Sequence, residues 1–467
     1  MGRAEPGYSE SEAFFPVVDA LSSASILRTG GHTMVYVGER TGTSYRLNRV
    51  DLDEPDKKIS RELGSNAAVI KAGGGRIGVI QAVEHGYEVF AGSYIKIYDA
   101  ASLGLLRTFP LAPPAASGRR VEPLHHRDPS LALGDKYAVV LTEDDGFFAG
   151  GGPQQYVSVY DIAGDKGASH TPAFSGAEGG PRGAANPALG IGVLMGALVN
   201  GDYLLLGGSS GTAVFRIDAG GAELAINRLT DSDGQGNHWF KDNGAYVLES
   251  KSGSGTVKVW KWGGVPRALG TVDINGNNSG NVQALCFDPD SPALAYFYCK
   301  AAASAAGSVP ASPNSGNVYS VDLEAETLRP VLRFKFPSLV IRVGSAYYNP
   351  VLTGLWTIEK QTAGSDEFFV FSGAYSYTPE GGGPVTVGAV LTVKNPAEGE
   401  TIGGVYRGAD STLDPKLREE RFNAPYNTAV RTLKTFKNSK GKLYLAAKNY
   451  TARGAPSEYR LILEEIR

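Results

Sequence analysis

The chain has 467 residues, of which 42% are hydrophobic and 20% charged, and its formal net charge is −3. A balance this close to neutral, without a long basic run, carries no electrostatic signature of nucleic-acid binding. No apolar run of about 18 residues occurs, so the sequence predicts no membrane span.

Glycine is abundant (61 residues), tyrosine is frequent (23), and methionine is scarce (3). Many glycines and aromatic residues without an extended helical period indicate short strands joined by tight turns. The sequence therefore predicts an all-β fold.

The cellular location has two interpretations. Residues 1–15 are polar and acidic and lack the apolar core of a signal peptide. The protein is either cytoplasmic, or periplasmic or extracellular as a mature chain with its signal removed and a Met-Gly start added. We favour the second, because the composition is rich in Gly, Tyr, Ser and Asn and poor in Met and Cys.

A recurring hairpin begins at the strand of residues 94–99. Tyr94, Lys96 and Tyr98 alternate with Ile95 and Ile97, which is the period of a strand with two unlike faces. The acid at residue 99 and a small-residue turn follow, and a second strand covers residues 105–109. This pattern predicts a β-hairpin.

Similar hairpins recur along most of the chain, at residues 45–63, 156–169, 212–229, 256–272, 317–334 and, more weakly, 388–405; an eighth opening strand ends the chain at 459–467. Five of the first strands end in an acid: Asp51, Asp99, Asp161, Asp218 and Asp322. Their recurrence favours turn chemistry over catalysis.

Two further strand-like segments precede most hairpins, and four-stranded units repeated along a chain are typical of β-propeller blades. We expect a single propeller of about eight blades, or seven if residues 338–405 hold an insertion. The last unit lacks a fourth strand, which residues 14–21 can supply by pairing the N- and C-terminal strands. The expected division is a flexible segment, residues 1–13, and a propeller domain, residues 14–467.

The strand-acid-turn-strand hairpins at residues 95–109, 157–162 and 318–323, and the related hairpin at 257–262, resemble those of bacterial WD40, YVTN and NHL-like propellers over nearly the whole chain. The Gly-His and Trp-Asp signatures of WD40 repeats are absent, and Trp260-Lys261 stands where Trp-Asp is expected. The resemblance therefore concerns architecture.

The sharpest local motif is residues 231–242, DSDGQGNHWFKD. Asp231, Asp233, Gln235 and Asp242 have the spacing of oxygen ligands in a calcium loop, and Gly236 occupies the position of the sharp turn. Position 12 is Asp rather than Glu, and no helices flank the loop. Calcium is the one cofactor that the sequence suggests, and the alternative is an ordinary Asp-Gly-rich connection.

Three weaker candidates remain. The acidic and amide residues of 273–281 resemble a second such loop without a distal acid, and His125-His126 near Asp128 can bind a transition metal or lie exposed in a loop. Cys286 and Cys299 flank a predicted hairpin turn. They either form a cross-strand disulfide or, as we favour, stay buried free thiols.

No nucleophile-elbow or H-E-x-x-H motif occurs. We therefore favour a non-enzymatic, monomeric binding or scaffold propeller that presents loops and a central funnel to a protein, or to a glycan. The alternative is a propeller enzyme of the hydrolase, lactonase or lyase type, with a metal or acid/base site at the central channel.

Overall fold

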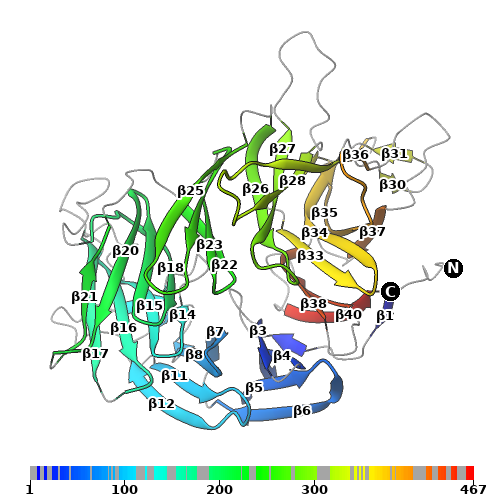
Figure 1. Ribbon diagram of the computed structural model, residues 1–467. Helices are drawn as coiled ribbons and strands as arrows, with labels where there is room; N and C mark the ends of the chain where they lie inside the picture. Colours follow the sequence, from blue (N-terminus) through cyan, green and yellow to red (C-terminus); the bar gives the residue numbers. More distant parts are fainter. Residues whose placement is uncertain are drawn as a thin grey trace. The chain divides into compact units, whose positions relative to one another are not determined.

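The computed structural model describes residues 8–466 apart from 11–14, 18–23, 112–120, 124–130, 145–153, 176–188, 231–237, 302–315, 403–416, 423–429, 438–442, 450–458 and shorter gaps of one to four residues. The described residues contain strands and turns and no helix, and none of them could therefore cross a membrane as a helix. Consecutive strands are joined as antiparallel hairpins (Figure 1).

Two compact units are distinguished. One is Pro16–Phe240 with Trp262–Pro266, and the other comprises Met1–Phe15, Lys241–Lys261 and Arg267–Arg467. We number the sheets of four or five strands in chain order from the first complete one.

The first unit carries four such sheets. The first sheet consists of β3 (Ala24–Thr29), β4 (His32–Thr41), β5 (Ser44–Asp51) and β6 (Glu54–Glu62); the second of β7 (Asn66–Gly73), β8 (Arg76–Ala82), β11 (Tyr94–Asp99) and β12 (Leu105–Pro110); the third of β13 (Val121–Pro123), β14 (Leu131–Leu133), β15 (Tyr137–Asp144), β16 (Gln154–Asp161) and β17 (Ala168–Ser175); the fourth of β18 (Leu194–Asn200), β19 (Tyr203–Gly208), β20 (Gly211–Asp218) and β21 (Ala225–Arg228). A two-stranded sheet of β9 (Glu84–His85) and β10 (Glu88–Val89) interrupts the second.

The other unit carries the remaining four. The fifth sheet consists of β22 (His238–Asp242), β23 (Tyr246–Lys251), β24 (Thr256–Lys261) and β25 (Arg267–Asp273); the sixth of β26 (Ser279–Phe287), β27 (Leu294–Ala301), β28 (Gly316–Asp322), β29 (Val331–Phe336) and β36 (Glu400–Thr401); the seventh of β32 (Val351–Leu352), β33 (Thr357–Ala363), β34 (Asp366–Tyr377), β35 (Val385–Lys394) and β37 (Leu417–Phe422); the eighth of β38 (Val430–Lys437), β39 (Leu443–Asn449), β40 (Tyr459–Ile466), β1 (Tyr8–Glu10) and β2 (Phe15–Val17). A small sheet pairs β30 (Ile341–Val343) with β31 (Ala346–Tyr348).

The predicted all-β propeller fold is confirmed by these sheets, each built on antiparallel strand neighbours in the manner of a blade. N- and C-terminal strands do pair: β2, within the expected segment 14–21, contacts β40, and β1 pairs with β40 as well, with Tyr8 opposite Ile466. Whether this pairing closes a ring stays a prediction. The number of blades in a closed ring and the division at residue 13 stay predictions.

The irregular seventh repeat is a sheet of its own, in which β34 pairs with both β33 and β35. The segment after β35 does not return as a hairpin. Instead, β36 runs parallel to β29 at the edge of the sixth sheet, and the strand beside β35 is β37. The weak hairpin predicted at residues 388–405 is therefore wrong in its second strand.

Neighbouring sheets within a unit are held face to face by apolar side chains. Tyr36, Leu47, Ile77 and Tyr98 belong to one buried cluster, which joins the first sheet to the second. A further cluster, which includes Ile95, Ile97, Val140 and Tyr160, joins the second sheet to the third. The apolar face predicted for residues 94–98 is thus the contact between blades, where removal from water stabilises the packing.

Buried tyrosines add directed contacts between the same sheets. The Tyr36 hydroxyl donates a hydrogen bond to the Ala100 carbonyl at 2.8 Å, and Tyr160 donates to Leu111 at 2.9 Å. Burial raises the pKa of Tyr36 to about 12, so the hydroxyl remains a donor at neutral pH. Each hydrogen bond fixes one sheet against the backbone of the next.

Candidate functional site

The predicted calcium loop lies almost entirely outside the described residues. Asp231, Asp233 and Gln235 are not described, and Asp242 ends strand β22 with an exposed side chain. Calcium binding by this loop stays a prediction. The His125-His126 pair with Asp128, and the amides at 275 and 277, also lie outside the described residues.

The recurring acids are turn residues, as expected. In each of the five hairpins a carboxylate oxygen accepts the backbone N–H two residues later: Asp53 donates to Asp51, Ala101 to Asp99, Ala163 to Asp161, Gly220 to Asp218 and Glu324 to Asp322. This hydrogen bond is the defining contact of an Asx turn. It accounts for the recurrence of the acid without a chemical role.

The two cysteines are buried free thiols. The register places Cys286 opposite Tyr296 and Cys299 opposite Val282. Three residues of β27 separate the two positions, which is about 10 Å at the rise of a strand. This separation is too long for a disulfide, and the cross-strand disulfide considered from the sequence is wrong.

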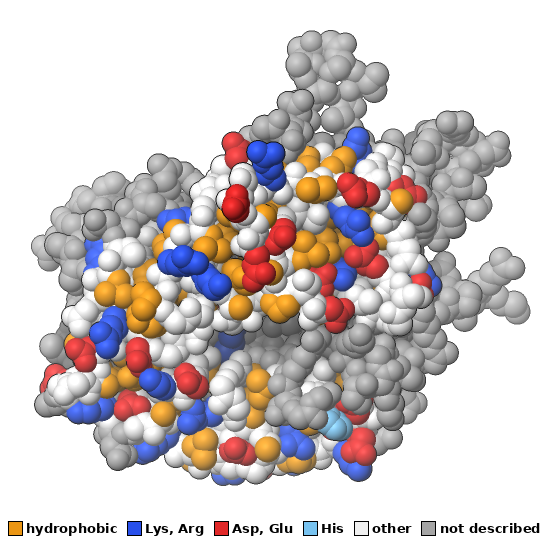
Figure 2. Space-filling model, in the orientation of Figure 1, with side chains coloured by type: hydrophobic (Ala, Val, Ile, Leu, Met, Phe, Trp, Pro, Cys, Tyr) orange, Lys and Arg blue, Asp and Glu red, His pale blue; other side chains and the backbone are white. Residues whose placement is uncertain are grey.

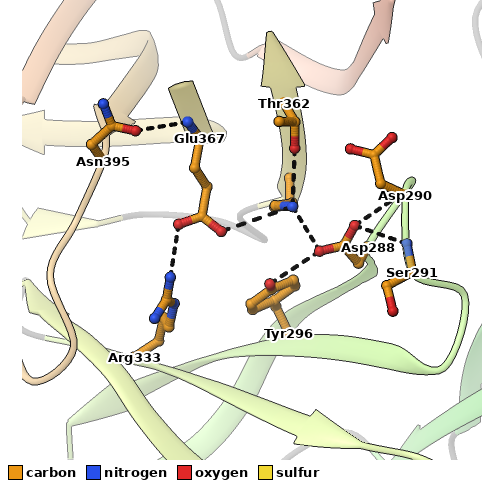
Figure 3. A network of polar contacts seen from close by, with 9 residues as sticks. Asp288, Asp290, Ser291, Tyr296, Arg333, Thr362, Glu367 and Asn395 are labelled. Atoms are coloured by element: carbon orange, nitrogen blue, oxygen red, sulfur yellow. Dashed lines mark hydrogen bonds and ion pairs between the residues drawn. The ribbon is translucent and has the colours of Figure 1, made fainter. Parts of the chain in front are cut away.

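A buried ionic network lies between the sixth and seventh sheets (Figure 3). The Lys360 ammonium donates to Asp288 Oδ2 at 2.7 Å and to Thr362 Oγ1 at 3.1 Å. The Tyr296 hydroxyl also donates to Asp288 Oδ2, at 3.1 Å. Two backbone N–H groups of the β26–β27 turn, from Asp290 and Ser291, donate to the other carboxylate oxygen. Protein donors therefore satisfy both Asp288 oxygens.

Glu367 extends this network. One of its oxygens is 2.9 Å from Arg333, and the other is 3.8 Å from Lys360. Its backbone N–H donates to Asn395 (Figure 3). The network joins β29, β33, β34 and the turn after β26, and its groups point at one another. The Lys360–Asp288 pair is buried, whereas Arg333 and Glu367 are partly exposed. A paired network with a buried centre fixes the packing of two sheets.

A second cation contacts the seventh sheet from β22. The Lys241 ammonium lies 2.9 Å from Glu359 Oε1. Burial, the largest influence, lowers the pKa of Lys241, but the Glu359 carboxylate, together with Cys286 and Asp242, raises it by more in sum, and the net shift is upward. Burial raises the pKa of the Cys286 thiol in the same region, and the Glu359 carboxylate raises it further. This thiol is therefore not an activated nucleophile.

Trp260, which stands where the Trp-Asp signature is expected, belongs to the core. It is buried, and its indole N–H donates to Glu249 Oε2 at 2.7 Å. The Lys258 ammonium lies 4.3 Å from the centre of its ring. The Trp260 ring is therefore engaged in core packing and in a cation–π contact with Lys258.

Among the described residues, one group of side chains has the composition and proximity of a metal site: His32, Asp51 and Asp53. His32 Nδ1 is 3.0 Å from Asp51 Oδ2 and 3.4 Å from Asp53 Oδ2. The histidine side chain is 44% exposed, whereas the two aspartate side chains are 11% and 3% exposed. We call these three residues the His32 cluster.

The sequence did not predict this cluster, because 19 residues separate His32 from Asp51 along the chain. The β4–β5 ladder pairs Met34 with Asp51, and the Leu52 N–H donates to the Thr33 carbonyl. Extending that register by one residue sets His32 opposite Asp53. The Asp-x-Asp pattern at residues 51–53 was the one sequence signal of this cluster. The strand register was needed to identify His32 as its partner.

The described surface carries both charge signs. Lys and Arg side chains are interspersed with Asp and Glu on the face drawn in Figure 2, and apolar side chains lie between them. Leu105 and Leu106 are adjacent exposed residues of β12, the edge strand of the second sheet, and they are 44% and 49% exposed.

No protein-family model and no curated protein matches the chain. Solved structures do match. Saccharomyces cerevisiae Sqt1 is 7% identical with a TM-score of 0.38, and 98% of each chain is covered. Kluyvelomyces marxianus Hsv2 is 8% identical with a TM-score of 0.35, over 75% of this chain and 90% of that one. The dihydro-heme d1 dehydrogenase NirN is 11% identical with a TM-score of 0.42, over 99% and 79%.

These TM-scores are below 0.5, so the fold assignment rests on the sheets. The protein is an all-β protein of the β-propeller class, with blades built on four antiparallel strands. Its particular family is not defined by these matches.

Proposed function

We propose that the protein is a non-enzymatic binding propeller that holds a protein partner. The observation that carries this proposal is the exposed edge of β12, where Leu105 and Leu106 lie side by side in the outermost strand of the second sheet. An exposed apolar edge strand is a template for pairing with an extended segment of another chain.

The same chain uses this mode of contact internally. At the edge of the sixth sheet, β36 pairs with β29, the Gly399 N–H donates to the Arg333 carbonyl, and the Ile402 N–H donates to the Lys335 carbonyl. Ile402 is completely buried there. An extended segment with an apolar anchor thus covers one blade edge, which supports an extended apolar peptide as the occupant of β12.

The polar groups support the same proposal. The recurring acids are engaged in turns, and the largest buried network described is internally paired. The enzymatic alternative expects ligands from several blades at one place, whereas the His32 cluster comes from a single sheet. Binding through strand edges and loops therefore accounts for more of the described residues than catalysis does.

A displayed library of extended peptides, selected on the purified protein, tests this proposal. We expect binders that slow amide hydrogen exchange in residues 105–110 and lose at least about tenfold in affinity with the double variant L105S/L106S. Val331→Ser is the matched control, because Val331 is an exposed apolar residue on β29, whose edge is already occupied by β36.

Binders that protect β12 and discriminate the two variants support the proposal. Selected peptides that bind the double variant as tightly as the unaltered protein, or no selected binder at all, would overturn it.

A further inference from the structure

The His32 cluster collects three metal-ligating side chains at one end of a single sheet. His32 begins β4, Asp51 ends β5, and Asp53 lies in the turn before β6. One ligand atom from each residue lies within 4.8 Å of the other two. The three residues belong to neighbouring strands and one tight turn, so backbone pairing holds them together.

The charges in this cluster call for a cation. Asp51 and Asp53 bring two largely buried carboxylates close together, and carboxylate oxygens are ligands for metal cations. The side chain that faces both is His32, which is 44% exposed on its other side. A cation bound to the carboxylates would be stabilised by them, and the cluster reaches solvent through the His32 side chain.

The distances fit the edges of a coordination polyhedron. With ligand bonds of about 2.0–2.1 Å, two tetrahedral ligands lie about 3.3 Å apart and two cis octahedral ligands about 2.9 Å apart. The observed N–O distances are 3.4 Å and 3.0 Å. Two of the three distances between ligand atoms therefore match such edges, and the third, between the two carboxylates, is at most 4.8 Å.

The other hairpins show that the turn does not require these residues. The position of Asp53 is occupied by Ala101 in the second sheet and Ala163 in the third. Continuing the strand registers, the position of His32 falls on Gly74 and Asp135. The Asx turn forms in both sheets without the histidine and without the second acid. The sixth sheet has an acid, Glu324, at the position of Asp53 but no histidine, so the combination of the two is specific to the first sheet.

We propose that the His32 cluster binds a divalent transition-metal ion such as Zn²⁺. His32 Nδ1, Asp51 Oδ2 and Asp53 Oδ2 are the protein ligands. An imidazole nitrogen with two carboxylate oxygens suits Zn²⁺ better than Ca²⁺, which prefers oxygen ligands alone. Three protein ligands leave a position for water or for a donor group of another molecule.

The test is calorimetric titration of Zn²⁺ into the full chain, free of any histidine tag and stripped with chelator. We expect His32→Ala and Asp53→Asn each to weaken Zn²⁺ binding at least about tenfold. Asp51→Asn removes the carboxylate and keeps the turn, because the asparagine side-chain oxygen can still accept the hydrogen bond from the Asp53 N–H. Circular dichroism without metal confirms that each variant is folded.

The controls separate this site from the other candidates in the chain. The double variants H125A/H126A and D231N/D233N, and the turn variant Asp99→Asn, are expected to retain the Zn²⁺ affinity lost by His32→Ala. Co²⁺ provides a second readout, since its visible absorption reports nitrogen and oxygen coordination and should disappear with His32→Ala.

Unchanged Zn²⁺ affinity in both His32→Ala and Asp53→Asn, or no binding by the unaltered protein at micromolar Zn²⁺, would overturn the proposal. The cluster would then be a structural contact between His32 and the two carboxylates.

Discussion

Two charged centres of this protein contain the same kinds of groups and differ in how they are completed. In the network around Lys360, backbone N–H groups, a tyrosine and a lysine saturate the Asp288 carboxylate, and both members of the ion pair are almost fully buried. In the His32 cluster, two buried carboxylates face an imidazole that is open to solvent. The first centre is closed by the protein itself, and the second has room for a ligand.

This difference separates residues that maintain the fold from residues that can bind. Burial with complete pairing stabilises the contact between two sheets but leaves no donor or acceptor for another molecule. Side chains that depart from the shared repeat and reach solvent are the candidates for function. The same reasoning applies to the exposed leucines of β12.

The largest expected effect concerns the reactivity of the two buried thiols, Cys286 and Cys299. Burial raises the pKa of Cys286 above its ordinary range and that of Cys299 to about 12. Neither thiol therefore forms a thiolate in the folded protein near pH 8. We expect a thiol reagent such as dithionitrobenzoate to modify no cysteine in the native protein and both after unfolding. Modification of either thiol without unfolding would contradict the buried arrangement.

The next effect is the loss of one partner from the closed centre. Lys360→Met removes the cation that pairs with the buried Asp288 side chain, and we expect a loss of roughly 3–5 kcal/mol in the free energy of unfolding. Urea denaturation measures this loss. The double variant K360M/D288N should recover part of it, because both charges are removed together.

A matched control for this change lies in the seventh sheet. Lys394 is 2.8 Å from Asp366, and both side chains are exposed. Lys394→Met should leave the free energy of unfolding nearly unchanged, because water replaces an exposed partner. Equal losses for Lys360→Met and Lys394→Met would show that burial does not determine how much each ion pair contributes to the free energy of unfolding.

A smaller effect is expected at the shared turn. The Ser102 backbone N–H and hydroxyl both donate to Asp99, which lowers the pKa of this carboxyl below its ordinary value. Asp99→Ala should cost about 1 kcal/mol or less at neutral pH, since the turn is exposed.

The pH dependence follows from the direction of that shift. A lowered native pKa stabilises the fold above the unfolded pKa of about 4, and the stabilisation is lost as the pH falls through the native pKa. The stability difference between Asp99→Ala and the unaltered protein should therefore shrink in acid. A difference that grows below about pH 4 would contradict the assigned hydrogen bonds.

The smallest effect on stability is expected at the open centre. His32 is exposed on one side, so His32→Ala should change the free energy of unfolding by no more than about 1 kcal/mol in chelator-treated protein. Added Zn²⁺ should raise the melting temperature of the unaltered protein and leave that of His32→Ala unchanged. A large destabilisation without metal would mark His32 as a structural residue instead.

The sequence was most informative where contacts are local. The alternation in residues 94–98 predicted a two-faced strand, and the acid at its end predicted a turn, because both features depend on neighbours a few residues away. The free thiols were also the favoured prediction. The hairpin register then excluded the alternative.

The two charged centres required information that lies between distant residues. Lys360 and Asp288 are 72 residues apart and come from different sheets, so no spacing in the sequence connects them. His32 and Asp53 share a hairpin ladder, but their proximity depends on a register that composition does not determine. The sequence instead directed attention to residues 231–242, whose calcium binding stays a prediction.

Crystallography with Zn²⁺ most directly tests the distinction between the closed network around Lys360 and the open His32 cluster. Crystals of the chelator-treated protein, soaked in Zn²⁺ and measured at the zinc absorption edge, should show an anomalous peak about 2.0–2.2 Å from His32 Nδ1, Asp51 Oδ2 and Asp53 Oδ2. No peak should lie near Lys360 and Asp288. A map without density at the His32 cluster, or with zinc only at residues 125–128 or 231–242, would contradict this account of the open centre.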